Sequence, residues 1–364
     1  MPGPPPVVAR ARTAVRAALT SRLEQLADDT AAGRLSPRLV VGLSGGADSL
    51  ALLATTVWVG SRMGLETEAA IVDHGLQAES GRVAERARTQ AERLGATAHV
   101  LQAQVPTDAA GGLENAARDA RRAALETLLE DRGGLALLLG HTLDDQAEQV
   151  LMALARGAGP RALAGIPRSR DGLLRPFLGT GRDETTALRR ADTEEICRLH
   201  DLQWWQDPMN ADESMLRARV RHRALPLLRE ILGEQIDENL ARSADLVRPD
   251  ADHLDAEAAE LLDSLRRDGS PAREEGDLLL LDVHALAATA APLRTRVLRD
   301  GSLSAQSAAR PPGAPGPTKS LLRRQVLAID ALVVSWHGQA AVPVPGRIEV
   351  ARRDGLLVWR RSDP

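Results

Sequence analysis

An aspartate set among glycines follows an apolar run near the start of the chain. The run begins at Leu39 and predicts a buried strand, and a helix-like apolar stretch begins after Ser49. Glycines let a backbone turn tightly and approach an anion, and the first N–H groups of a helix point towards it. The segment therefore predicts a phosphate-binding loop that consists of Ser44, Gly45, Gly46, Ala47, Asp48 and Ser49.

The charged residue of this loop determines which ligand it suits. The better-known P-loop ends in Gly-Lys-Ser/Thr, where the lysine contacts the terminal phosphates. Here the charged residue is Asp48, which would repel a polyphosphate unless a divalent cation lies between the two. We therefore expect a nucleotide together with Mg²⁺. The alternative is an ordinary turn with Ser44 as the N-cap of the next helix.

A second group of charged residues occupies the segment GHTLDDQAE (140–148). His141 follows an apolar run, and Asp144, Asp145 and Glu148 begin the next predicted helix. Residues three and four apart share one side of a helix, so these three acids should lie together. They could hold Mg²⁺, bind an ammonium group or act as a base. The pattern Thr142-x-x-Asp145 also resembles a capping box, which alone would explain Asp145.

Strand-like and helical patterns alternate around both segments. The expected strands are 40–44, 69–75, 98–103 and 135–141, and the expected helices between and after them are 48–60, 79–94, 113–131 and 144–155. Apolar strands that alternate with helices predict a parallel sheet covered on both faces. Ligands of such sheets bind beyond the carboxyl ends of the strands. Ser44, His74 and His141 all lie at such ends.

The pattern changes along the chain and suggests three parts. Residues 1–36 read as a proline-rich tail (1–8) and a helix from about Ala9 to Ala27, and residues 37–235 hold the α/β pattern. Residues 236–364 read as a smaller, α-rich domain that ends in a hairpin turning at Asp354-Gly355. Within it, the Pro/Ala/Ser/Gly stretch 302–318 predicts a mobile loop.

Composition limits the class of protein. The 364 residues are 43% hydrophobic and 26% charged, which is typical of a globular protein. The single cysteine, Cys197, excludes an intramolecular disulfide and a metal site built from cysteines. No run reaches the roughly eighteen apolar residues of a membrane span, and the N-terminus lacks an apolar signal core. We expect a cytoplasmic enzyme with no membrane contact, and the sequence leaves its oligomeric state open, a homodimer included.

The net charge of the whole chain is −4, so an RNA substrate would need a positive surface that is local. An arginine tract is the best candidate for that surface. On a helix, Arg217 and Arg221 would form one stripe and Arg219 and Arg223 a neighbouring one. We expect one stripe to reach the active centre and the other to contact a nucleic-acid backbone. The alternative is a solvated helix face.

These motifs resemble a known family. SGGxDS after a strand is the signature of the PP-loop ATP pyrophosphatases, whose fold is a Rossmann-like parallel sheet of the adenine nucleotide α-hydrolase type. The order of the motifs is similar to that of the tRNA(Ile)-lysidine synthases. The matching segments are SGGADS (44–49), VDHGL (72–76), AARDAR (116–121), HTLDDQAE (141–148), RGAG (156–159), RPF (175–177), DPMN (207–210) and RARVRHRALPLL (217–228).

The resemblance implies an activity. Such an enzyme uses ATP to adenylate the wobble cytidine in the CAU anticodon of tRNA(Ile). Free L-lysine then displaces AMP from C2 of the base, which gives lysidine, AMP and pyrophosphate. The later part of the chain resembles the family's following domain more loosely, and implies a C-terminal domain that binds tRNA.

The resemblance also implies roles for particular residues. Asp48 would anchor Mg²⁺ on ATP, and Asp145 and Glu148 would hold the lysine ammonium and then accept its proton. His74 and Arg118 would join the loop in binding ATP, although each is equally explained as an ordinary polar surface residue. The remaining substrate residues would be His141, Asp144, Arg217, Arg219 and Arg221.

Three other functions remain to be weighed. A tRNA thiolase of the same superfamily generally relies on paired cysteines, whereas Cys197 stands alone. An amide-forming ligase for small molecules would have no need of the arginine tract. A catalytically silent RNA-binding protein would have no use for Asp48 among RNA phosphates. Release of AMP and pyrophosphate, with lysine and tRNA added singly and together, separates all four.

Overall fold

The chain forms two compact units in the computed structural model, Met1–Arg248 and Pro249–Pro364. The structure describes residues 3–28, 35–73, 75, 79–103, 113–181, 186–207, 212–267, 269–310 and 318–362. The division between the units falls inside the helix α11 (Ile236–Leu265), directly before Pro249. We call the two parts unit 1 and unit 2.

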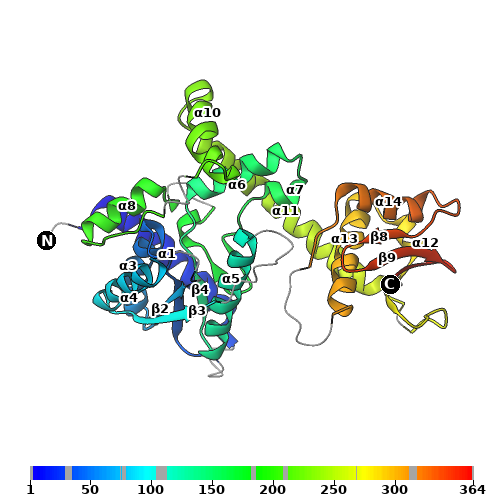
Figure 1. The fold of residues 1–364 in the computed structure, drawn as a ribbon, viewed down its shortest axis with the longest axis horizontal. Coiled ribbons are helices and arrows are strands. Elements are labelled where there is room, and N and C mark those ends of the chain that lie inside the picture. The colour runs from blue at the N-terminus through cyan, green and yellow to red at the C-terminus, as the bar shows by residue number, and fades with distance from the viewer. Residues whose placement is uncertain are drawn as a thin grey trace. The chain divides into compact units, whose positions relative to one another are not determined.

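Unit 1 is built on a six-stranded sheet with the order β3-β2-β1-β4-β6-β5 (Figure 1). The strands are β1 (Arg38–Gly42), β2 (Glu66–Asp73), β3 (Thr97–Gln102), β4 (Ala136–Leu138), β5 (Ser169–Arg170) and β6 (Leu173–Leu174). All neighbouring strands are parallel except β5, which pairs with β6 in the antiparallel direction. The predicted parallel α/β fold is therefore confirmed.

Helices connect these strands and extend the unit. They are α1 (Pro6–Gln25), α3 (Ala47–Arg62), α4 (Ser80–Leu94), α5 (Leu113–Asp131), α6 (Leu143–Ala155), α7 (Pro160–Leu163), α8 (Arg190–Leu199), α9 (Leu216–Arg219) and α10 (Leu225–Leu232). A 3₁₀ turn covers Pro176–Leu178, and a π-helical turn, Val220–Ala224, joins α9 to α10. The first helix begins three residues earlier than expected, because proline fits the first position of a helix, where its missing N–H costs nothing. The proline-rich tail is correspondingly shorter.

Both faces of the sheet are covered, as the apolar strands predict. Alternate residues of β1 divide between two cores: Leu39 and Val41 pack with α1, α3, α4 and α8, whereas Val40 packs with α5. The strand β4 divides in the same way, with Leu138 in the first core and Leu137 in the second. This packing fixes the carboxyl ends of β1 and β4 beside each other, which is where the site lies.

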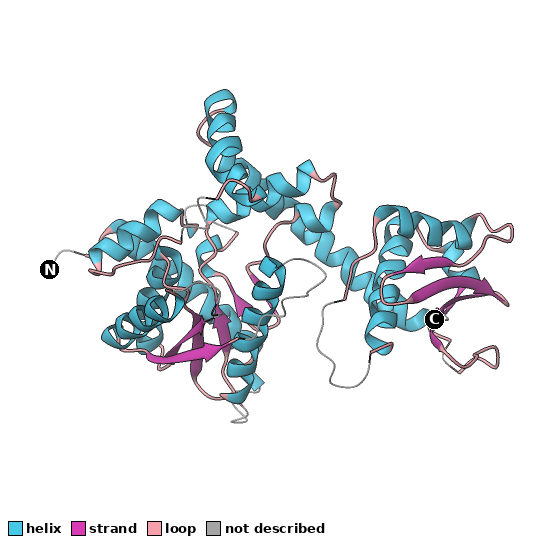
Figure 2. Cartoon of the chain, in the orientation of Figure 1, coloured by secondary structure: helices cyan, strands magenta, loops and turns pink. Residues whose placement is uncertain are grey.

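Unit 2 combines an antiparallel sheet with three helices and the end of α11 (Figure 2). The sheet has the order β7-β10-β9-β8. Its strands are β7 (Asp277–Asp282), β8 (Val342–Val344), β9 (Ile348–Arg353) and β10 (Leu356–Arg361), and its helices are α12 (Val283–Ala288), α13 (Ala291–Ala308) and α14 (Arg323–Val334). Trp359 is fully buried, and its Nε1 donates to Ser302 Oγ at 2.8 Å.

Two expectations about unit 2 need correction. The hairpin that turns at Asp354-Gly355 is confirmed, but it belongs to a four-stranded sheet whose strands β7 and β8 were not expected. The stretch 302–318 was expected to be a mobile loop, yet α13 continues through Ala308, where Ser302 and Ala305 are buried. The proline-rich residues 311–317 lie outside the described residues.

Candidate active site

The loop between β1 and α3 has the tight geometry that the sequence predicts. Gly45 has φ +82°, a conformation that favours glycine, and a Cβ there would lie 3.3 Å from Val83 Cγ1. The Ser49 hydroxyl accepts from Ser44 N at 3.2 Å and donates to the Gly46 carbonyl at 3.0 Å. The N-cap of α3 is Gly46, not Ser44. Asp48 and Ser49 therefore lie in the first turn of α3, above the end of β1.

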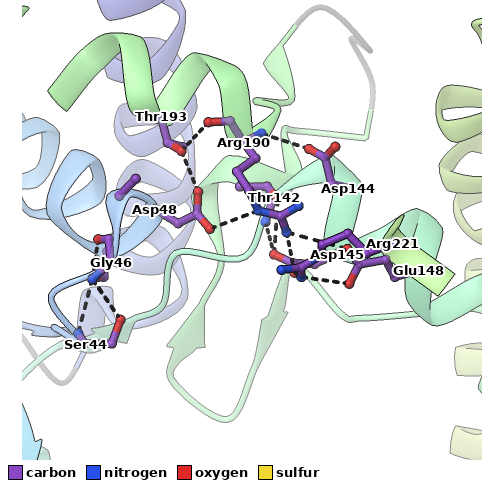
Figure 3. Close-up of polar contacts among 12 residues, drawn as sticks. Ser44, Gly46, Asp48, Thr142, Asp144, Asp145, Glu148, Arg190, Thr193 and Arg221 are labelled. Carbon is purple, nitrogen blue, oxygen red and sulfur yellow. Dashed lines mark hydrogen bonds and ion pairs between the residues drawn. The ribbon is translucent and has the colours of Figure 1, made fainter. Parts of the chain in front are cut away.

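The Asp48 carboxylate is held from the opposite side by α8 (Figure 3). Thr193 Oγ1 donates to Asp48 Oδ1, and Arg190 Nε lies 3.9 Å from Oδ2. Burial raises the pKa of Asp48 to about 6; the hydrogen bond from Thr193 and the charge of Arg190 oppose the rise, and Asp145 and Asp144 add to it. Asp48 therefore loses its negative charge by protonation just below neutral pH.

Two of the acids at the start of α6 act as helix caps. Asp145 Oδ2 accepts from Thr142 N at 2.9 Å, so the predicted capping box is present. Asp144 Oδ2 accepts from Arg190 N at 2.8 Å and so caps α8 rather than its own helix. The other oxygen of Asp145, Oδ1, lies 3.3 Å from both Arg190 Nη2 and Arg217 Nη2. Asp145 therefore has one structural oxygen and one that faces the site.

Glu148 is the most enclosed acid of the group, with no exposed surface on its side chain. Its two oxygens accept from Arg217 Nε at 2.8 Å and from Arg221 Nε at 2.7 Å, and Arg221 Nη2 adds a third contact at 3.1 Å (Figure 3 shows Arg221). Arg217 and Arg221 thus form the stripe of the tract that faces the site.

The other stripe points elsewhere. Arg219 is exposed, and its Nη1 donates to the Glu213 and Ser214 carbonyls at 2.9 and 2.7 Å. Arg223 is also exposed and pairs with the Glu213 carboxylate. The π-helical turn Val220–Ala224 lies within this tract, and such turns are frequent at functional sites.

The charges around α6 also determine two further pKa values. Burial would raise the pKa of Asp145, but Arg217 and Arg190, together with the Thr142 N–H, outweigh it, so the pKa is lowered. Burial lowers the pKa of His141 to about 4, and the charges of Arg175 and Arg118 act in the same direction. His141 is therefore neutral at physiological pH, and its buried Nδ1 has no hydrogen-bond partner among the residues that the structure describes.

Several arginines act electrostatically on His141 and on one another. Burial, then the charges of Arg122, Arg170 and Arg118, lower the pKa of Arg175 to about 10. Within the described part of the chain, the buried Nε of Arg175 has no hydrogen-bond partner. Like charges held together in this way are relieved by an anion. Arg118, expected at the ATP phosphates, is exposed on α5. His74, expected in the nucleotide pocket, lies outside the described residues.

Three residues of the site were not identified from the sequence: Gly140, Arg190 and Thr193. A Cβ on Gly140 would lie 2.7 Å from the Asp48 carbonyl oxygen, so glycine is what lets the end of β4 approach the phosphate-binding loop. Arg190 carries a positive charge at the first position of α8, where the helix dipole disfavours it. This unfavourable position could have indicated from the sequence that Arg190 pairs with acidic residues of other helices.

Comparison with known proteins identifies the family. Residues 16–228 match a family model described as a PP-loop domain. The chain is 41% identical over 358 residues to the tRNA(Ile)-lysidine synthase of Thermobifida fusca, covering 98% of this chain and 99% of that protein. It is 43% identical over 333 residues to the one of Mycobacterium tuberculosis, covering 89% and 91%. The chain belongs to the tRNA(Ile)-lysidine synthase family.

Family membership confirms the resemblance inferred from the motifs. The PP-loop match contains the phosphate-binding loop, the acids of α6 and the arginine tract, and the T. fusca lysidine synthase aligns through unit 2 as well. A solved U34-tRNA thiolase from Methanococcus maripaludis is more distant, at 17% identity and a TM-score of 0.48 over 58% of this chain and 72% of that one. None of the described helices is long and apolar enough to span a membrane.

Proposed function

We propose that this chain joins free L-lysine to C2 of the wobble cytidine in the CAU anticodon of tRNA(Ile), with ATP converted to AMP and pyrophosphate. The observation that carries the proposal is the meeting of Asp48 with the acids of α6 around one guanidinium. Arg190 lies 3.9 Å from Asp48 and 3.3 Å from Asp145. This arrangement supports a nucleotide site at Asp48 beside a site for a cationic substrate on α6, in a member of the lysidine synthase family.

The reaction has two balanced steps. The carbonyl oxygen at C2 attacks the α-phosphorus of ATP, and pyrophosphate leaves. The lysine ε-nitrogen then attacks C2, the C2–O bond breaks, and AMP leaves with that oxygen while the amine loses a proton. Both steps need the reacting groups held side by side, which accounts for much of the rate gain in bimolecular reactions.

The phosphate-binding loop and Asp48 suit Mg²⁺ bound to ATP. Magnesium in nucleotide sites is usually held by one or two carboxylates together with phosphate oxygens. Among the described residues no group of three or more His, Cys, Asp or Glu could hold a metal alone, so the phosphates would supply the remaining ligands. Asp48 Oδ2 lies beyond hydrogen-bonding distance of Arg190 Nε, which makes it the oxygen best placed for the ion. When bound, Mg²⁺ would neutralise charge on the phosphates.

The lysine ammonium is best placed at Asp145 Oδ1. Asp145 is 13% exposed and Glu148 is fully enclosed, so lysine reaches Asp145 first. The lowered pKa of Asp145 suits it to hold an ammonium group and makes it a weak base for the proton. We propose that Glu148 acts through Arg217 and Arg221, which it fixes against α6, and that Asp144 and His141 shape the same pocket.

The tRNA is proposed to contact three groups of residues. Arg219 is exposed, which suits a contact with the RNA backbone. The arginines around Arg175, with Arg118, suit phosphates close to the target base or the ATP phosphates. Unit 2 is proposed as the domain that binds the body of the tRNA. A cytoplasmic location follows from this substrate, and a homodimer stays a prediction.

Release of AMP and pyrophosphate tests the proposal. We expect full turnover only when ATP, lysine and a tRNA(Ile) transcript with a CAU anticodon are all present. A thiolase would turn over without lysine; its sulfur chemistry would have to use Cys197, which is buried with a pKa raised to about 12 by burial and by Asp48. A small-molecule ligase would turn over without tRNA, and an RNA-binding protein would release no AMP.

A further inference from the structure

Arg190 joins the two halves of the site through one side chain. Its guanidinium lies 3.9 Å from Asp48 Oδ2, 3.3 Å from Asp145 Oδ1 and 3.6 Å from Glu148 Oε1 (Figure 3). These three carboxylates come from two different helices, α3 and α6, while Arg190 comes from a third, α8. A guanidinium placed between them is attracted by all three charges.

The backbone of Arg190 is fixed by hydrogen bonds, whereas its side chain is held less closely at Asp48, at 3.9 Å, than at Asp145, at 3.3 Å. Its N–H donates to Asp144 Oδ2 at 2.8 Å, and its carbonyl lies 2.7 Å from Thr193 Oγ1, whose single proton it shares with Asp48 Oδ1. The side chain is 26% exposed, and its contact with Asp48 is longer than a hydrogen bond. The side chain can therefore leave Asp48 without disturbing the start of α8.

A divalent ion on Asp48 would meet this guanidinium at close range. Two cations beside one carboxylate repel each other, and the effect is strong where water is partly excluded. Binding of the ion would therefore weaken the contact between Arg190 and Asp48, and would change how firmly Arg190 holds Asp145 and Glu148.

We propose that Arg190 is a positioning residue that competes with Mg²⁺ for Asp48 and thereby couples the nucleotide site to the lysine site on α6. The inference rests on the proposed function of those two sites. Coupling between two ligands is reciprocal, so lysine at Asp145 must change the affinity for Mg²⁺–nucleotide by the same factor as the reverse. Without Arg190, the two ligands should bind almost independently.

Calorimetry on the full chain tests this directly. Mg²⁺ is titrated into protein that contains a non-hydrolysable ATP analogue, with and without saturating lysine. In Arg190→Gln we expect the Mg²⁺ concentration at half-saturation to fall about fivefold. We expect lysine to shift that concentration in the wild type and to leave it almost unchanged in Arg190→Gln. Arg190→Lys keeps a positive charge and should restore most of the wild-type behaviour. Arg190→Met repeats the test should the glutamine variant not fold.

Arg198→Gln is the matched control, because Arg198 is an exposed arginine of the same helix that pairs with Glu194. It should match the wild type in both titrations. An unchanged or higher Mg²⁺ half-saturation in Arg190→Gln, at an unchanged melting temperature, overturns the inference. Wild-type protein that binds nucleotide without any need for Mg²⁺ would instead contradict the proposed metal site itself.

Discussion

Replacement of Glu148 by glutamine separates a structural role for this acid from a direct role in binding lysine. Glu148 is fully enclosed and receives hydrogen bonds from Arg217 and Arg221. Removing one partner of a buried ion pair typically costs about 3–5 kcal/mol. Arg217 and Arg221 are 30% and 22% exposed, so water compensates in part and we expect the lower end, about 3 kcal/mol. In a unit of this size, that lowers the melting temperature by roughly 6–12 °C.

The assay combines thermal unfolding with lysine titration of AMP release. Glu148→Gln should melt early, while the KM for lysine, measured well below that melting temperature, should change less than that of Asp145→Asn. Glu126→Gln is the control, because Glu126 forms an exposed pair with Arg122 on one helix; it should alter stability by less than about 0.5 kcal/mol. A Glu148→Gln protein that is as stable as the wild type but needs far more lysine would refute the reasoning and make Glu148 a lysine ligand.

Three further predictions concern the loop and the tRNA. Because the pKa of Asp48 is about 6, its ionised share falls from about nine-tenths at pH 7 to about one-tenth at pH 5. Mg²⁺-dependent nucleotide binding should therefore weaken roughly tenfold over that range in calorimetry, and His141, with a pKa of about 4, should contribute little. A pH profile identical to that of Asp48→Asn would contradict this. Gly140→Ala places a Cβ against the backbone of Asp48 and should destabilise the protein by about 1–3 kcal/mol in denaturant unfolding, whereas an unaltered midpoint would mean that the loop moves freely. Arg219→Gln should weaken tRNA binding and reduce the slope of its salt dependence by about one, without affecting nucleotide affinity; equal loss of both would place Arg219 in the nucleotide site.

The parallel sheet was predictable because its residues carry a local signal. Runs such as Leu39–Val41 are apolar at every position, and each is followed by a turn and a helix of the right length. The Thr142–Asp145 capping box is equally local, since its partners are three residues apart. In contrast, the strand β7 contains four consecutive leucines. Such a run has the hydrophobic period of neither a strand nor a helix, so the sequence alone does not show which of these structures it forms.

The contacts inside the site were not predictable in the same way. Thr193 and Asp48 are 145 residues apart, and only the packing of α8 against α3 brings them together. The acids of α6 were correctly placed near the loop, yet their arginine partners follow from the tertiary fold. Arg190 alone gave a hint, because a positive charge at a helix N-terminus needs an acidic partner from another element.

Transfer of labelled lysine to RNA tests the central claim most directly. The protein is incubated with ATP, Mg²⁺, labelled L-lysine and a tRNA(Ile) transcript whose anticodon is CAU. We predict that one lysine becomes covalently attached per tRNA at the wobble cytidine, with one AMP released for each, and that Asp48→Ala abolishes both. AMP release without attachment of lysine, or attachment by the Asp48→Ala protein at the wild-type rate, would contradict the account.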